Sequence, residues 1–255
     1  MEADFDRRFG GIGRLYGTAA QERFREAHVC VVGIGGVGSW AAEALARSGI
    51  GAITLVDLDN VAESNTNRQI HALEDTFGMA KVTAMAARIR AINPDCRIVE
   101  IENFVTPDNA AAMFAPGFDC VIDAIDQVKA KVAMIACCHA AKLPIIVAGG
   151  AGGKIDPTCL RLDDLSRTVQ DPLLARVRSL LRKEHGFPRD AKRKFGVTAV
   201  YSTEAVRQPQ ANQECEVRTP SGDLNCAGFG SSMCITASFG LFAVSAALRL
   251  LMESK

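Results

Sequence analysis

A glycine-rich segment followed by a carboxylate forms the first candidate site in this chain. Gly33-Ile34-Gly35-Gly36-Val37-Gly38 fits the pattern G-x-G-x-x-G and lies between an apolar run and a helical stretch. Glycines let the backbone approach a phosphate closely, and the N–H groups at the start of the helix attract its negative charge. Asp57 ends the next apolar run, where a carboxylate can accept hydrogen bonds from a ribose. The sequence therefore predicts a nucleotide or dinucleotide site that uses Gly33, Gly35, Gly36, Gly38 and Asp57.

Cations and further carboxylates downstream favour a triphosphate over a dinucleotide. They occur in Asp57-Leu58-Asp59, Asn65-Thr66-Asn67-Arg68-Gln69, Gly78-Met79-Ala80-Lys81 and Asp123-Ala124-Ile125-Asp126. An enzyme that cleaves ATP needs cations on the departing pyrophosphate, and Arg68 and Lys81 can supply them. Asp123 or Asp126 can hold Mg²⁺ against the phosphates. The alternatives are structural: Arg68 capping a helix, Lys81 on the surface and Asp126 as a helix N-cap. A nicotinamide oxidoreductase is disfavoured, because it would have no use for Arg68 and Lys81.

The elements that must position these residues alternate along the chain. Apolar runs typical of strands cover 28–32, 52–56, 97–101, 120–122 and 144–147, with helical stretches near 39–48, 81–92, 108–114 and 128–141. Strands separated by helices form right-handed βαβ units and a parallel sheet covered on both faces. We therefore expect an α/β fold. A Rossmann-like, mostly parallel sheet in residues 28–155 is completed by a C-terminal extension, 156–255, within one structural domain.

Composition limits the class of protein. The chain has 255 residues, and 29 Lys+Arg balance 29 Asp+Glu, so the zero formal net charge excludes a broadly polybasic protein. The 48% hydrophobic content excludes global disorder. Nine cysteines, an odd number without any C-x-x-C pair, argue against a disulfide framework and a four-cysteine zinc site. We expect a reducing, cytoplasmic compartment in which most of these thiols are small core residues.

A basic stretch stands out within the more polar extension. It consists of Arg176, Arg178, Arg182, Lys183, Arg189, Lys192, Arg193 and Lys194, opposed only by Glu184 and Asp190. One interpretation is a solvated helix and loop. The other is a surface for the phosphate backbone of a nucleic acid.

Neither end of the chain predicts an integral membrane protein. Residues 1–8 are charged and have no apolar core, so no signal peptide is expected. The uncharged segment 228–248 approaches the length of a membrane span, but it contains serines, a threonine and glycines and is followed by Arg249. We expect a buried or dimer-interface helix, with membrane association through 228–248 as the weaker alternative.

Taken together, these motifs resemble the adenylating domain of the ubiquitin-activating enzyme superfamily. Within it, the chain is most similar to the bacterial tRNA threonylcarbamoyladenosine dehydratases. The resemblance covers nearly the whole chain and is carried by Arg8-Phe9-Gly10-Gly11, Gly33–Trp40, Asn65–Leu73, Gly149–Gly153, Asp171-Pro172-Leu173 and Gly228-Phe229-Gly230.

The resemblance implies a homodimer that uses ATP and Mg²⁺. ATP would adenylate the threonyl carboxylate of N6-threonylcarbamoyladenosine beside a tRNA anticodon, and intramolecular attack would then release AMP and the cyclic form. Gly36 and Asp57 would bind the adenosine half of ATP, and Asp59, Asn65 and Asp123 are further expected cofactor-binding residues. Asn67, Arg68 and Lys81 would bind the phosphates, and Asp126 would bind the metal. Residues 1–27 would form an arm that carries Arg8 into the partner subunit's site. A monovalent cation at 149–153 is a further expectation.

Two departures keep other functions open. Sulfur-carrier activators of this superfamily often have paired C-x-x-C zinc ligands, which this chain lacks, and Asp-Asn where it has Asp126-Gln127. Cys226, in a polar setting flanked by glycine, matches a thiol that the dehydratases link to sulfur transfer from a cysteine desulfurase to its acceptor. Cys226 is thus a nucleophile or sulfur acceptor, or else a structural thiol. The alternatives are an activator of a small sulfur-carrier protein and a sulfur-relay partner of a cysteine desulfurase.

Overall fold

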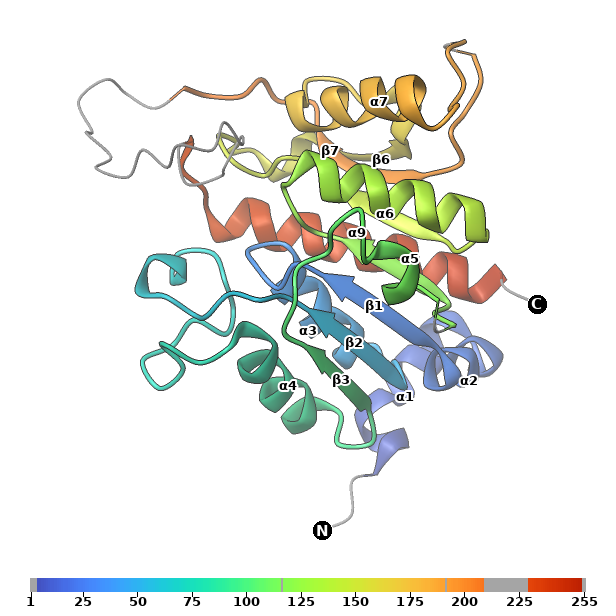
Figure 1. Ribbon diagram of the computed structural model, residues 1–255. Helices are drawn as coiled ribbons and strands as arrows, with labels where there is room; N and C mark the ends of the chain where they lie inside the picture. Colours follow the sequence, from blue (N-terminus) through green and yellow to red (C-terminus); the bar gives the residue numbers. More distant parts are fainter. Residues whose placement is uncertain (1–3, 116, 191, 209–228, 254–255) are drawn as a thin grey trace.

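The fold is organised around one seven-stranded sheet. The computed structural model describes residues 4–115, 117–190, 192–208 and 229–253. The strands follow the order β3-β2-β1-β4-β5-β7-β6, and all neighbouring pairs are parallel except β6 and β7 (Figure 1). Their bounds are β1 His28–Val32, β2 Ala52–Val56, β3 Arg97–Ile101, β4 Cys120–Asp123, β5 Ile145–Ala148, β6 Leu160–Asp164 and β7 Thr198–Ser202.

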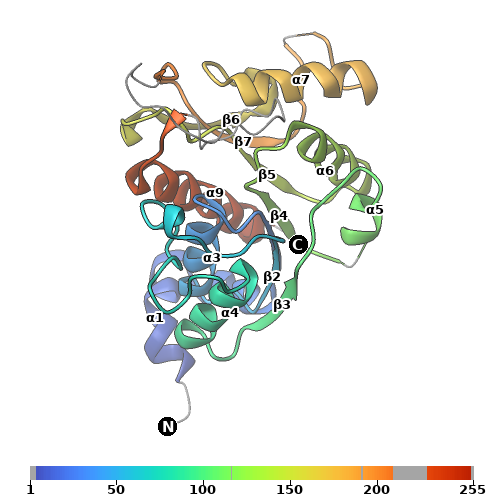
Figure 2. The same cartoon turned by 60° about the vertical axis from the view of Figure 1, so that its left-hand side comes forward.

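Helices cover both faces of this sheet (Figure 2). One face packs against α2 Thr18–Glu26, α3 Gly38–Arg47, α4 Lys81–Ile92 and α9 Met233–Glu253, with α1 Phe5–Tyr16 beside them. The other face packs against α5 Ala110–Met113, α6 Val128–Ala141 and α7 Pro172–Glu184. The expected α/β, Rossmann-like fold with helices on both faces is confirmed.

Strand register determines where the candidate site lies. Val32, the last residue of β1, pairs with Val56 on one side and with Asp123 on the other. The segments after β1, β2 and β4 therefore leave the sheet at the same carboxyl edge. The chain continues from β1 to β2 and β3 on one side and returns to β4 and β5 on the other. Ligands of open α/β sheets bind at this point, where the strand order reverses.

The C-terminal extension adds strands to the same sheet. β7 pairs with β5, and β6 lies outside β7 at the sheet edge. Sequence patterning had left this region without strands, because the burial of β6 is uneven and its last residues are polar. Three 3₁₀ turns, Glu63–Asn65, Pro157–Cys159 and Leu165–Arg167, complete the connections.

The apolar C-terminal segment forms α9, which packs across the sheet rather than standing apart from it. By length and composition the helix could cross a membrane, yet 61% of its most apolar stretch is buried inside the protein. Ile235, Phe239, Ala243 and Ala247 are fully buried in the core that α9 shares with α3. Gly240 permits the close approach, because a Cβ there would lie 2.6 Å from the Val37 carbonyl oxygen. This packing agrees with the expected buried helix.

Candidate active site

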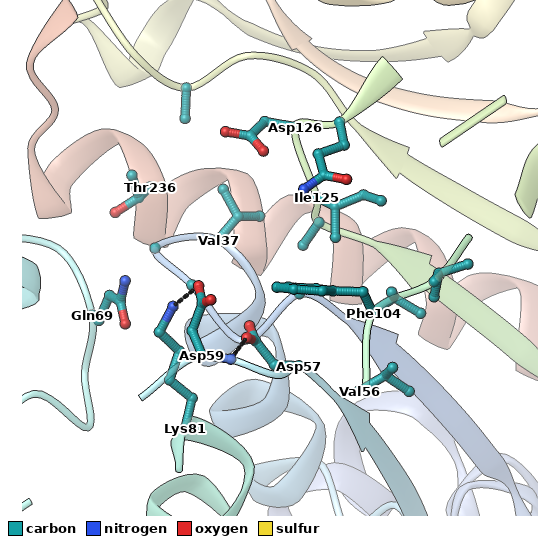
Figure 3. A pocket seen from close by; sticks show the side chains of 18 of the residues that line it. Val37, Val56, Asp57, Asp59, Gln69, Lys81, Phe104, Ile125, Asp126 and Thr236 are labelled. Atoms are coloured by element: carbon teal, nitrogen blue, oxygen red, sulfur yellow. Dashed lines mark hydrogen bonds and ion pairs between the residues drawn. The ribbon is translucent and has the colours of Figure 1, made fainter. Parts of the chain in front are cut away.

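A pocket opens at the carboxyl edge of the sheet, where β1, β2 and β4 end (Figure 3). It is lined by backbone of the glycine-rich segment and by side chains from several loops. The lining comprises Val32, Gly33, Gly35, Gly36, Val37, Val56, Asp57, Asp59, Arg68, Gln69, Lys81, Asn103, Phe104, Val105, Ala124, Ile125, Asp126, Gln127, Gly149, Gly150, Ala151 and Thr236. Eight of the predicted site residues thus meet in one place: Gly33, Gly35, Gly36, Asp57, Asp59, Arg68, Lys81 and Asp126.

Glycines make the tight turn after β1 possible. Gly33 has φ +86°, and a Cβ on it would lie 2.8 Å from Ile125 Cγ2. A Cβ on Gly38 would lie 1.8 Å from the Gly33 carbonyl oxygen, so only glycine fits at the first residue of α3. Gly38 therefore shapes the pocket from behind and does not line it. The turn aims the backbone at the pocket, as a phosphate-binding segment requires.

Asp57 holds this turn in place. Its Oδ2 accepts a 2.6 Å hydrogen bond from the Ile34 N–H, and its Oδ1 accepts one of 2.9 Å from the Asp59 N–H. Burial raises the pKa of Asp57, and the nearby Lys81 ammonium opposes that rise. The carboxylate thus links the ends of β1 and β2 and still borders the pocket.

Lys81 is the buried cation of the pocket. It is the first residue of α4, and its Nζ lies 2.8 Å from Asp59 Oδ2. The Lys81 backbone N–H also donates to the Asp59 carbonyl oxygen, at 3.0 Å. The Lys81 side chain is 8% exposed and the Asp59 carboxylate 56% exposed, so the pair reaches from the protein interior to the pocket mouth. A phosphate entering here would compete with Asp59 for the ammonium.

Arg68 and Asn67 tie the loop after β2 to the start of α9. Arg68 Nη1 donates to the Ser64 carbonyl oxygen at 2.7 Å and to Asn67 Oδ1 at 3.0 Å, while Asn67 Nδ2 donates to the Ser231 carbonyl oxygen at 2.9 Å. Of the two, only Arg68 lines the pocket. Asn65 is buried and its Oδ1 accepts from the Ala62 N–H, so it shapes the loop from outside the pocket.

Asp126 lies on the opposite side of the pocket from the Lys81–Asp59 pair (Figure 3). Within the described residues, no group of three or more His, Cys, Asp or Glu side chains could hold a metal ion. A single carboxylate beside a phosphate pocket nevertheless fits Mg²⁺, because this ion keeps several waters and binds through one or two carboxylates and substrate phosphates. The pocket therefore suits a metal that arrives with the nucleotide.

Asp123 does not reach the pocket, contrary to its predicted cofactor-binding role. Its side chain is fully buried, and its Oδ1 lies 2.8 Å from Lys131 Nζ, which also donates to the Ala148 carbonyl oxygen. Burial raises the pKa of Asp123, with Lys131 acting against it. Oδ1 also accepts from the Ile125 N–H, at 3.2 Å. Asp123 thus holds the turn that leads to Asp126 and joins it to the end of β5.

Arg8 lies far from the pocket of its own chain. Its Nη1 donates to the carbonyl oxygens of Ala91 and Ile92, at 3.4 and 2.7 Å. These carbonyls end α4, whereas Lys81 begins it, and a helix of 12 residues is about 18 Å long. The guanidinium is held there because the carbonyl end of a helix attracts cations.

Four cysteines within the described residues are buried: Cys30, Cys96, Cys120 and Cys138. Burial raises the pKa of Cys96 to about 11 and that of Cys120 and Cys138 to about 12, and it also raises the pKa of Cys30. These four are unreactive core thiols, as expected. Cys226, the predicted nucleophile or sulfur acceptor, lies outside the described residues.

Phe104, Gln69 and Thr236 line the pocket but were not among the predicted site residues. Phe104 is 43% exposed although aromatic, and its ring points into the pocket (Figure 3). Gln69 is buried there, and its Oε1 has no hydrogen-bond partner among the residues that the structure describes. Thr236 Oγ1 donates to the Arg68 carbonyl oxygen at 3.3 Å. Phe104 could have been found, because it follows β3 at the same carboxyl edge. Thr236 comes from a helix more than a hundred residues away in sequence and gave no local signal.

Comparison of the chain with known proteins shows the family to which it belongs. The ThiF family model matches residues 10–254, almost the entire chain. The chain belongs to the ThiF family. The superfamily that the motifs resemble is thereby confirmed. ThiF relatives include the tRNA threonylcarbamoyladenosine dehydratase of Escherichia coli K12, which is 54% identical over 250 residues, covering 96% of this chain and 93% of that protein. The enzyme of the same name from Bacillus subtilis 168 is 42% identical and matches 79% of this chain and 80% of its own length.

Solved ThiF-family structures share the fold. The crystal structure of the Escherichia coli tRNA N6-threonylcarbamoyladenosine dehydratase in complex with ATP matches with a TM-score of 0.88 at 52% identity, covering 97% of this chain and 94% of that one. The same protein in complex with AMP matches equally well. By contrast, the molybdopterin-synthase adenylyltransferase of Escherichia coli is 35% identical over only 53% of this chain and 54% of its own.

Proposed function

We propose that this chain catalyses the ATP-dependent dehydration of N6-threonylcarbamoyladenosine in tRNA to its cyclic form. The observation that carries the proposal is the pocket itself: a glycine-rich turn, the cations Arg68 and Lys81, and the Asp126 carboxylate meet at the edge of the sheet. Relatives named for this reaction match the chain over almost its full length, including the extension beyond the nucleotide-binding half. An adenylyltransferase of another pathway matches only about half of it.

Each part of ATP has a partner in the pocket. Backbone N–H groups of the glycine-rich turn face the phosphates, and Asp57 accepts from the ribose. Phe104 offers an apolar face to the adenine. Arg68 and Lys81 stabilise the charge that develops on the departing pyrophosphate. Asp126 would hold Mg²⁺ against the phosphates, where the ion supplies further charge stabilisation.

Adenylation and cyclisation balance without a covalent enzyme intermediate. A threonyl carboxylate oxygen attacks the α-phosphorus, and the bond from that phosphorus to the pyrophosphate oxygen breaks. A ureido nitrogen then attacks the activated carbonyl carbon and loses its proton, and AMP departs with the bridging oxygen. One oxygen atom of the carboxylate therefore ends in AMP. Cys226 is not needed for either step, and its link to a cysteine desulfurase and a sulfur acceptor remains a prediction.

The basic surface formed by α7 and the segment after it, residues 176–194, supports contact with tRNA. Six of the eight basic residues between 176 and 194 are exposed, while Arg178 and Arg182 are half-buried. Arg182 has a structural role, since its guanidinium lies 5.2 Å from the centre of the Phe195 ring. Asp171 caps the start of α7 close to Gly150 of the pocket. The exposed Arg176 and Lys183 lie further along this helix, and the other four exposed cations belong to the segment that follows it. A tRNA substrate and the buried thiols support the proposal of a cytoplasmic location.

Arg8 is proposed to act across a homodimer, because it cannot reach the pocket of its own chain. Mixed dimers of Arg8→Ala and Lys81→Met chains test this. A trans arrangement leaves one site of each mixed dimer intact, so mixing restores activity that both parent homodimers lack. If Arg8 acted within its own chain, the mixed dimers would stay inactive.

Isotope transfer tests the proposed reaction. A tRNA anticodon stem-loop whose threonyl carboxylate carries ¹⁸O is incubated with the protein and Mg-ATP. We expect one ¹⁸O atom in each AMP formed, in step with loss of the threonylcarbamoyl nucleoside. Dehydration with unlabelled AMP would contradict adenylation of the carboxylate.

A further inference from the structure

A second cavity adjoins the nucleotide pocket, and the two share Asp126 and Gly150. The second cavity lies between the glycine-rich segment after β5 and the start of α7. Its apolar wall comes from Pro172, Leu173, Val206 and Phe229. One buried cation, Lys154, lies among them and has no role in the site described so far.

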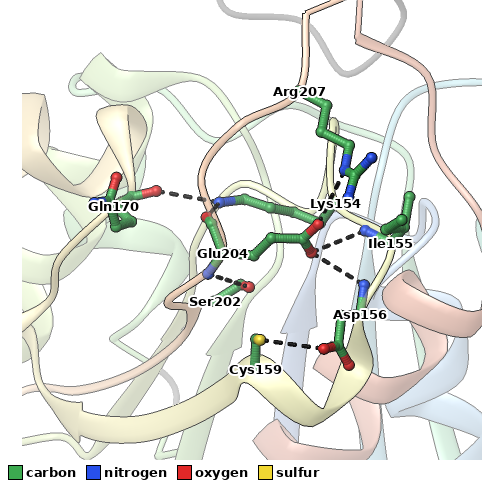
Figure 4. A network of polar contacts seen from close by, with 8 residues as sticks. All are labelled: Lys154, Ile155, Asp156, Cys159, Gln170, Ser202, Glu204 and Arg207. Atoms are coloured by element: carbon green, nitrogen blue, oxygen red, sulfur yellow. Dashed lines mark hydrogen bonds and ion pairs between the residues drawn. The ribbon is translucent and has the colours of Figure 1, made fainter.

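The Lys154 ammonium is held by two hydrogen bonds and has a third N–H donor to offer. Its side chain is buried, the whole residue being only 3% exposed, and its Nζ donates to the carbonyl oxygens of Gln170, at 3.2 Å, and of Glu204 (Figure 4). An ammonium has three N–H donors. No third acceptor for Lys154 Nζ occurs within the part of the chain that the structure describes. Burial lowers the pKa of this amine, while the carboxylates of Asp171 and Glu204 oppose that shift.

The surrounding contacts make the cavity a built feature. Glu204 accepts from the N–H groups of Ile155 and Asp156, at 2.9 and 3.0 Å, and from Arg207 Nε, at 3.2 Å (Figure 4). The Gly153 N–H donates to the Gly230 carbonyl oxygen at 3.0 Å. Segments that are far apart in sequence are thereby fixed around the Lys154 ammonium.

Chemistry limits what the second cavity can receive. A carboxylate that is adenylated must touch the α-phosphate of ATP, so its carrier must occupy a space that opens onto the nucleotide pocket. The second cavity opens beside Asp126, the carboxylate placed to hold the metal. Its apolar wall suits a methyl group, and its buried ammonium suits a carbonyl or carboxylate oxygen.

We propose that the second cavity binds the threonylcarbamoyl arm of the modified adenosine and that Lys154 donates its third N–H to an oxygen of that arm. This inference rests on the proposed function and deepens it. The basic surface of residues 176–194 binds RNA of any kind, whereas Lys154 and its cavity select RNA that carries the arm.

Paired binding measurements test this assignment. The Kd of an anticodon stem-loop with the threonylcarbamoyl group is compared with that of the same RNA without it, in the presence of a non-hydrolysable ATP analogue. Lys154→Met should reduce the preference for the modified RNA at least about tenfold, while the Kd of the unmodified RNA and of the ATP analogue stay unchanged. The exposed Lys142→Met, at the far end of α6, is the matched control and should keep the preference.

A second variant tests the assignment if Lys154→Met does not fold. Phe229→Ala removes part of the apolar wall at a half-exposed position and should also reduce the preference. An unchanged preference in a folded Lys154→Met protein would overturn the assignment, as would an unchanged preference in Phe229→Ala if Lys154→Met does not fold. Dehydration by the wild-type protein is measured in parallel. If the wild type converts no modified RNA, the proposed function fails; if it converts the RNA and the variants keep the preference, only this inference fails.

Discussion

Lys81 and Asp59 form an ion pair whose two partners lie in different surroundings, one buried and one at the mouth of the nucleotide pocket. The 2.8 Å contact joins the first residue of α4 to the loop after β2. Because Asp59 is more than half exposed, water can replace Lys81 as its partner at small cost. The buried ammonium is therefore available to an entering phosphate, and the pair explains how a cation is kept in the pocket before ATP arrives.

Replacing Lys81 should reduce catalysis strongly and change the stability of the fold little. Lys81→Met keeps most of the length of the side chain and removes the charge, so we expect AMP formation to fall about a hundredfold. The free energy of unfolding should change by no more than about 1 kcal/mol, since the lost pair is largely exposed on the Asp59 side. Single-turnover AMP release and urea denaturation measure the two effects. Full turnover by the variant would remove Lys81 from the site.

Two glycines of the nucleotide-binding turn should respond differently to the same change. Gly38→Ala places a Cβ 1.8 Å from the Gly33 carbonyl oxygen and should cost about 3 kcal/mol of stability. For Gly35→Ala the nearest atom is Gln69 Nε2 at 3.9 Å, so stability should change by less than about 1 kcal/mol. The new methyl group at Gly35 borders the pocket and should weaken ATP binding. Equal stability of the two variants in thermal unfolding would contradict the geometry of the turn.

The buried pair of Asp123 and Lys131 should behave as a unit. Lys131→Met leaves a buried carboxylate unpaired and should cost about 3–5 kcal/mol. Adding Asp123→Asn removes the uncompensated charge, so the double variant should recover part of that loss. Urea denaturation of the two single variants and the double variant gives the coupling energy. Simple addition of the two single losses would show that the pair does not act together.

His71 should make the protein sensitive to mild acid. The imidazole is 1% exposed, and neither ring nitrogen has a partner among the described residues. Burial, helped by the charges of Lys81 and Arg88, lowers its pKa from 6.5 to about 4. The unfolded chain therefore binds a proton first as the pH falls, and stability is lost between about pH 6.5 and pH 4.

The size of this effect follows from the pKa difference. Between pH 7 and pH 5, His71 should account for a loss of about 2 kcal/mol in the free energy of unfolding. His71→Gln should lose about that much less than the wild type over the same interval in urea denaturation. Identical pH dependence of the two proteins would show that His71 is not held neutral.

Local patterns in the sequence were sufficient for the nucleotide-binding half. The five expected strands of 28–147 occur within one residue of their predicted bounds, and the helices at 81–92 and 128–141 match theirs. Local patterns carry no information on pairing between distant segments, so β6 and β7 were missed. Asp123 was misplaced for the same reason: only the fold shows that Lys131 reaches it. The roles of Arg8 and of Mg²⁺ stay predictions, because each depends on a molecule that the single chain does not contain.

The central claim is that this chain removes one water from a threonylcarbamoyl nucleoside at the expense of ATP. Mass spectrometry of nucleosides from tRNA that carries the modification, incubated with the protein and Mg-ATP, tests it most directly. We expect loss of one water from threonylcarbamoyladenosine, dependent on ATP and absent with Lys81→Met. An unchanged nucleoside, with a protein shown to bind ATP and a tRNA shown to carry the modification, would contradict it.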